Sequence, residues 1–75
     1  MRLLPMPSGK SIFGANLRRL RVEHGWTQEY LAEKSNLSLR YIQWLEAGKK
    51  FPRIEALRKL RCGLGCEWNE LLAKL

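Results

Sequence analysis

Apolar residues recur at helical spacing along most of the chain and predict an all-α protein. Phe13, Leu17 and Leu20 occupy the i, i+4 and i+7 positions of one helical face, and Gly25 suits the left-handed residue that often ends a helix. Residues 1–10 contain two prolines, a glycine and a serine but show no helical or strand period. We therefore predict a flexible N-terminal arm over residues 1–10 and a helical domain over residues 11–75.

Two short helices joined by a tight turn are predicted next. Thr27 offers a hydroxyl N-cap for a helix that ends near Ser35, and Ser38 offers one for a second helix that ends at Gly48. Between them, Asn36 tolerates the left-handed backbone conformation that a three-residue turn requires. This order of helix, tight turn and helix predicts a helix-turn-helix.

Two more helices complete a compact bundle of five. Pro52 suits the first position of a helix, because its missing N–H costs nothing there, and Gly65 suits the end of that helix. The last short helix is expected either to join two copies of the chain in a homodimer or to cover the core of its own chain. Its apolar residues are Trp68, Leu71, Leu72 and Leu75.

Length and charge narrow the class of protein. The chain has 75 residues, and 14 Lys and Arg against 7 Asp and Glu give a net charge of +7. A chain this short forms one small domain, and no apolar stretch approaches the roughly 18 residues of a membrane span. The excess positive charge favours a polyanionic partner, which on composition alone is DNA, RNA or an anionic membrane.

The candidate chemistry does not point to an enzyme. No nucleophile is paired with a base, and no carboxylate pair or metal-ligand cluster stands out, so we expect no catalytic site, no metal and no cofactor. Cys62 and Cys66 are too few for a disulfide scaffold, and His24 is distant from them in sequence. The expected location is the cytoplasm, in association with the nucleoid.

The segment TQEYLAEKSNLSLRYIQWLEAGKKFP resembles the helix-turn-helix of phage-repressor, Cro and XRE-like DNA-binding regulators. The resemblance extends from about Phe13 to Leu72. It implies a lambda-repressor-like fold and a transcriptional regulator of prokaryotic or phage type that binds specific sequences in double-stranded DNA, as a homodimer. Residues 38–47 would form the recognition helix in the major groove. The matched positions are Arg21, Gln28, Ala32, Leu37, Ile42, Leu45, Glu46, Gly48 and Pro52.

Steps of 100° per residue put Ile42 and Leu45 on the buried side of this recognition helix. The opposite side carries Arg40, Gln43, Trp44 and Ala47, and Ser38 and Leu39 begin the helix. We expect all six at the DNA. Arg40 suits guanine and Gln43 suits adenine. Trp44 either contacts DNA, through a sugar or a thymine methyl, or belongs to an apolar patch for another protein.

Phosphate contacts are expected on both sides of the recognition helix. Gln28 opens the preceding helix, where backbone N–H groups favour an anion, and Lys49, Lys50 and Arg53 follow the recognition helix. Residues 1–24 and 49–75 each carry +4, whereas residues 25–48 have two bases against three acids. The flanks are therefore expected to supply affinity, and the slightly acidic centre to supply sequence choice.

The resemblance also implies a structural ion pair between Arg21 and Glu46. An alternative function is a protein-interaction module, or an antitoxin-type regulator, that keeps this fold and binds DNA only weakly and without sequence preference. In that case Leu39, Tyr41 and Trp44 would form the interaction surface.

Overall fold

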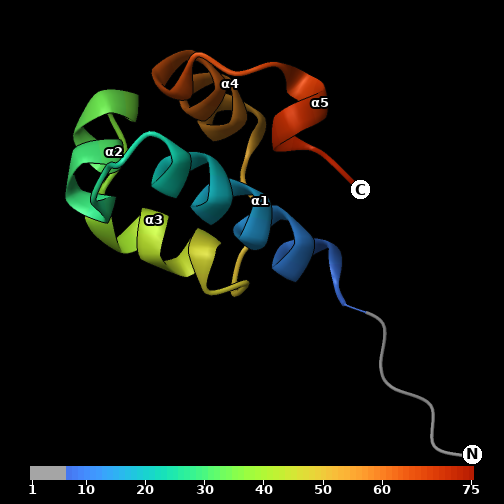
Figure 1. The fold of residues 1–75 in the computed structure, drawn as a ribbon. Coiled ribbons are helices and arrows are strands. Elements are labelled where there is room, and N and C mark those ends of the chain that lie inside the picture. The colour runs from blue at the N-terminus through green and yellow to red at the C-terminus, as the bar shows by residue number, and fades with distance from the viewer. Residues whose placement is uncertain (1–6) are drawn as a thin grey trace, which may run out of the picture.

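The structure is a computed structural model that describes residues 7–75. Over this range α-helix is the only regular secondary structure, and the chain forms five helices (Figure 1). They are α1 (Gly9–Glu23), α2 (Gln28–Ser35), α3 (Leu39–Glu46), α4 (Ile54–Leu64) and α5 (Trp68–Leu71). The predicted all-α bundle of five helices is confirmed. None of the helices within residues 7–75 is long and apolar enough to cross a membrane.

Two helix boundaries differ from the prediction. Helix α1 begins at Gly9, two residues earlier than expected, because the Ser8 hydroxyl accepts a hydrogen bond from the Ser11 N–H at 3.1 Å and caps the helix. The rest of the predicted arm, residues 1–6, lies outside the described residues. Helix α4 begins at Ile54 rather than at Pro52, which is buried in the preceding extended segment.

The helix-turn-helix consists of α2 and α3, as its local signals predict. Thr27 Oγ1 accepts a hydrogen bond from the Tyr30 N–H at 3.0 Å, and Ser38 Oγ accepts one from the Tyr41 N–H at 3.1 Å. Asn36 adopts a φ of 55° in the left-handed region and ends α2. These interactions lie within a few residues of one another in sequence, which is why the pattern predicts them.

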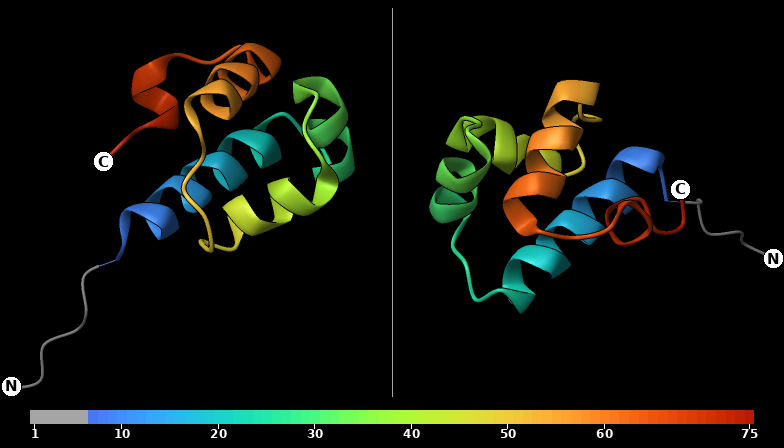
Figure 2. Two further views of the ribbon diagram at one scale, coloured as in Figure 1. Left: turned by 180° about the vertical axis from the view of Figure 1, so that it is seen from behind. Right: turned by 90° about the horizontal axis from the view of Figure 1, so that it is seen from above.

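Helix α1 lies in the middle of the bundle. It packs against α3 on one side and α5 on another, while α2 packs against both α3 and α4 (Figures 1 and 2). The extended segment between α3 and α4 contacts α1 through Phe51, whose ring centroid is 5.7 Å from that of Phe13. The fully buried apolar side chains come from all five helices and form one core: Phe13, Leu17, Leu31, Ile42, Leu45, Leu60 and Leu71.

Gly14 sets the distance between α1 and α3. A Cβ atom at this position would collide with the Leu45 carbonyl oxygen and would lie 3.0 Å from the Glu46 carbonyl oxygen. Both atoms belong to the backbone of α3, which cannot move aside as a flexible side chain can. The periodicity of α1 does not reveal this close approach, although a glycine within an amphipathic helix is a known sign of one.

Helix α5 covers the core of its own chain. Leu71 is fully buried, so its predicted role as a dimer contact is wrong. The side chain of Asn16, itself buried in α1, donates hydrogen bonds to the carbonyl oxygens of Leu71 at 3.1 Å and Ala73 at 2.8 Å. This long-range contact holds the C-terminal segment against α1. Trp68 and Leu75 remain exposed.

We predict that Gly14→Ala lowers the free energy of unfolding by about 1–3 kcal/mol, the usual range for overpacking a tight contact. The matched control is Gly9→Ala in the same helix, where a Cβ would contact only the Leu75 and Phe51 side chains at 3.7 Å. The control should stay within about 0.5 kcal/mol of the parent chain in urea denaturation. Equal stability of the two variants would contradict the close crossing.

Candidate nucleic-acid interface

The outer face of α3, together with its C-cap residue Ala47, carries the four residues that helical spacing predicts to be exposed. Ile42 and Leu45 are fully buried against α1 and α2. All four residues of the opposite face are solvent-exposed: Arg40, Gln43, Trp44 and Ala47. Because they follow the i, i+3, i+4, i+7 pattern, they form one continuous stripe along the helix.

An ion pair fixes the C-terminal end of α3. Arg21 Nε donates to Glu46 Oε2 at 2.7 Å, and Arg21 Nη2 donates to Glu46 Oε1 at 3.0 Å. The two side chains are only 12% and 4% exposed. The hydrogen bonds to Glu46 raise the pKa of Arg21 above its ordinary value, so the guanidinium stays charged. This is the pair that the family resemblance implies.

Two further hydrogen bonds extend this contact to the other helices. Arg21 Nη1 donates to the Trp26 carbonyl oxygen at 2.6 Å, and Gln28 Nε2 donates to Glu46 Oε1 at 3.1 Å. Residues from α1, the α1–α2 loop, α2 and α3 therefore share one polar cluster. The Gln28 amide, which was expected to contact a phosphate, is bonded to Glu46 in this structure.

The ion pair changes the electrostatic character of α3. Glu46 is the one acidic residue of that helix, and its carboxylate is buried against Arg21. The other two acids of the slightly acidic central segment, Glu29 and Glu33, belong to α2. The exposed face of α3 consequently carries the positive charge of Arg40 without a negative charge from its own helix.

A hollow of about 430 Å³ lies beside this face, between α3, the following loop and α4. Trp44 lines this hollow, and Lys50 Nζ lies 5.0 Å and Arg40 Cζ 5.9 Å from the centroid of its ring. Both cations are within the range of a cation–π contact. The hollow is lined by four cationic residues in all: Arg40, Lys50, Arg53 and Lys59.

The loop after α3 is fastened to α3 by Tyr41. The Arg53 N–H donates to the Tyr41 hydroxyl oxygen at 3.2 Å, and Arg53 Cζ lies 5.1 Å from the centroid of the Tyr41 ring. Lys59 of α4 also lines the hollow, and the sequence did not predict it as a residue of this surface. A lysine on the polar face of an amphipathic helix gives no sign of its neighbours until that helix is packed beside the turn.

The other predicted interface residues lie around this centre. Lys49 is exposed next to Lys50, and the Ser38 hydroxyl is used as the cap of α3. Leu39 and Tyr41 are partly buried and pack against the core. Of the three residues in the alternative interaction surface, only Trp44 is thus exposed, which weakens the case for a protein-binding patch.

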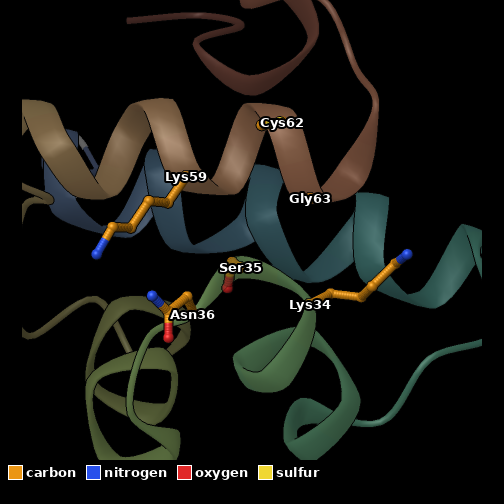
Figure 3. Close-up of a pocket in the computed structure, with 6 residues that line it drawn as sticks. All are labelled: Lys34, Ser35, Asn36, Lys59, Cys62 and Gly63. Carbon is orange, nitrogen blue, oxygen red and sulfur yellow. The ribbon is translucent and has the colours of Figure 1, made fainter.

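A second hollow lies along the seam between α2 and α4 (Figure 3). The two helices approach closely there, since a Cβ on Gly63 would lie 3.3 Å from the Lys34 carbonyl oxygen. Ser35 donates its hydroxyl to the Leu31 carbonyl oxygen at 2.6 Å and is occupied within α2. Within residues 7–75, no three His, Cys, Asp or Glu side chains gather as a metal site. This seam is a packing feature.

The structure thus contains a capped helix-turn-helix whose second helix is exposed beside four cationic side chains. These features are typical of DNA-binding regulators. The sequence profile of the helix-turn-helix family matches residues 17–71. The chain therefore belongs to the XRE-type helix-turn-helix family and is a DNA-binding transcriptional regulator.

Named relatives agree with this assignment. An uncharacterized HTH-type transcriptional regulator, y4dJ of Sinorhizobium fredii, is 36% identical over 63 residues, which cover 84% of this chain and 82% of the relative. The restriction-modification controller protein C.AhdI of Aeromonas hydrophila has a similar structure, with a TM-score of 0.79, 35% identity and coverage of 83% of this chain and 94% of that one. The clp gene regulator ClgR of C. glutamicum is also similar in structure, with a TM-score of 0.82 and 34% sequence identity. The match covers 89% of this chain and 87% of that one.

We predict that Glu46→Ala lowers the free energy of unfolding by about 3–5 kcal/mol, because it leaves the Arg21 guanidinium largely buried without its partner. The control is Glu23→Ala, which breaks the exposed Arg19–Glu23 pair at 3.8 Å. That exposed pair is worth under about 1 kcal/mol. A loss below about 0.5 kcal/mol for Glu46→Ala, measured by chemical denaturation, would contradict the structural role of the pair.

Proposed function

We propose that this regulator recognises specific sequences in double-stranded DNA by placing α3 in the major groove. The observation that carries the proposal is the exposed stripe of Arg40, Gln43, Trp44 and Ala47 beside a cation-lined hollow. The major groove displays a distinct set of hydrogen-bonding groups for each base pair. Arg40 would donate to O6 and N7 of guanine, and Gln43 would pair with N6 and N7 of adenine.

Phosphate contacts on both sides of the groove would set the register of α3. Lys49, Lys50 and Arg53 follow α3 directly, and all three are exposed. Gln28 lies on the other side at the first residue of α2, where free backbone N–H groups favour an anion. Such contacts supply affinity but carry no base information. The protein would thus act by binding at the nucleoid, without a catalytic step or cofactor.

A homodimer would give this small DNA-binding surface sufficient affinity for DNA. One module of this size covers few base pairs, and two modules on a two-fold site would place their half-sites about one helical turn, roughly 34 Å, apart. Trp68 and Leu75 remain exposed in the C-terminal segment, which also contains the partly buried Leu72. The Arg61 guanidinium lies 5.2 Å from the Trp68 ring, which helps to orient it. We propose this surface as the dimer contact.

Selection of bound sites from a random duplex pool tests the proposed function. A sequence-specific regulator should enrich a two-fold symmetric site and should prefer it to random DNA by 10³-fold or more at moderate salt. Uniform, salt-sensitive binding of all duplexes would instead support the alternative of a protein-interaction module on this fold.

We predict that Arg40→Ala weakens binding to the selected site by about 1–3 kcal/mol and relaxes the preference at one base pair. The matched control is Lys50→Ala in the adjacent loop, which should weaken selected and random duplexes alike because it removes a phosphate contact. Binding to both duplexes would be measured at several salt concentrations. Equal losses on both duplexes for Arg40→Ala would refute its role in base reading.

The dimer contact is tested by analytical ultracentrifugation. We predict that Trp68→Glu raises the dimer dissociation constant at least tenfold, roughly 1.4 kcal/mol, because it puts a charge into an apolar contact. Val22→Glu is the control, since Val22 is also exposed but belongs to the last turn of α1 and not to the C-terminal segment. A Trp68→Glu variant that dimerises as tightly as the control would place the contact elsewhere.

A further inference from the structure

Trp44 combines a large apolar surface with an unusually cationic setting. Its side chain is 36% exposed, and it is the one exposed large apolar residue, among residues 7–75, that lines the hollow beside α3. The polar groups around it include the ammonium of Lys50 and the guanidinium groups of Arg40 and Arg53. The other apolar residues that line the hollow, Leu37 and Tyr41, are partly buried. This surface suits a polyanion that also presents an apolar group.

Double-stranded DNA is such a polyanion. Its phosphates supply the charge, and the apolar group that its major groove presents is the C5-methyl group of thymine. Arg40 and Trp44 are one turn apart on α3 and lie on the same exposed stripe. Four residues of an α-helix span about 6 Å along its axis, and successive base pairs are about 3.4 Å apart. The two side chains would therefore contact base pairs that are close together in the DNA.

We propose that Trp44 is a specificity-determining residue that reads the C5-methyl group of a thymine close to the guanine bound by Arg40. This inference rests on the proposed function and identifies a base feature that α3 recognises. The Trp44 ring would cover the methyl group and remove it from water. In the free protein, the contact with Arg40 keeps the guanidinium beside the ring, so Trp44 also holds Arg40 near its place in the groove.

The contact with Lys50 supports the same orientation. Lys50 belongs to the loop that Tyr41 fastens to α3, and its ammonium lies over the Trp44 ring at 5.0 Å. On DNA the ammonium can turn to a phosphate while the ring keeps its place on α3. Trp44 and Lys50 would then contact the same DNA segment in different ways, with one sensitive to the base and the other insensitive to it.

The experiment uses the duplex obtained by selection with the full chain. Each thymine is replaced in turn by deoxyuridine, which lacks only the C5-methyl group, and dissociation constants are measured by fluorescence anisotropy. We expect one thymine per half-site at which uracil weakens binding roughly fourfold, the factor expected for loss of one buried methyl group. Uracil at the other thymines should have a smaller effect.

Protein variants then assign the effect to Trp44. In Trp44→Ala the ratio of uracil to thymine dissociation constants at that position should fall to about 1, while Trp44→Phe should retain part of it. Val22→Ala is the control, because Val22 is also exposed but lies on α1, outside the proposed DNA and dimer contacts, and it should keep the full ratio. Circular dichroism melting curves establish that each variant is folded.

The outcomes separate the two proposals. A selected site that tolerates uracil at every thymine would overturn the methyl-reading role while leaving sequence-specific binding in place. The same conclusion would follow if Trp44→Ala kept the discrimination, or bound the selected site as tightly as the parent chain. A pool without any enriched sequence would refute the proposed function, and the role of Trp44 with it.

Discussion

The buried ion pair between Arg21 and Glu46 is the interaction on which the reading surface depends. Hydrogen bonds from Arg21 and Gln28 converge on one carboxylate, so the end of α3 is held by α1 and α2 at once. Gly14 lets the backbones of α1 and α3 approach closely enough for this contact. A buried pair of this kind adds little net stability over an apolar contact, but its geometry is strict. Its value here lies in fixing the direction of α3.

The same contact determines the charge that DNA would meet. Pairing Glu46 with Arg21 removes the negative charge of α3 from its outer surface, and the loop after α3 brings Lys50 and Arg53 beside that surface. Tyr41 fastens this loop through the backbone of Arg53. One side of α3 therefore packs against the core, while the other side exposes the aromatic ring of Trp44 among cationic side chains. This division of α3 is what connects the fold to recognition.

Features that depend on nearby residues in the chain could be predicted. The caps at Thr27 and Ser38 and the left-handed Asn36 each involve atoms a few residues apart, so the pattern of residue types is sufficient to locate them. Features that depend on distant residues were missed or misplaced. Leu71 was expected either at a dimer surface or over the core, and the choice is made by Asn16, which holds that segment over the core from 55 residues away. Lys59 likewise reaches the hollow only because α4 packs beside α2.

The sequence by itself determined that the described part of the chain is all-α, where the tight turn falls, and which residues of α3 face away from the core. Helical periodicity and capping are local properties, and side chains repeat along a helix whatever it packs against. Only the tertiary structure decided the charge of the exposed face, the burial of Leu71 and the neighbours of Trp44. These depend on which helices meet through space, because burial and electrostatic pairing arise between residues that are far apart in the chain.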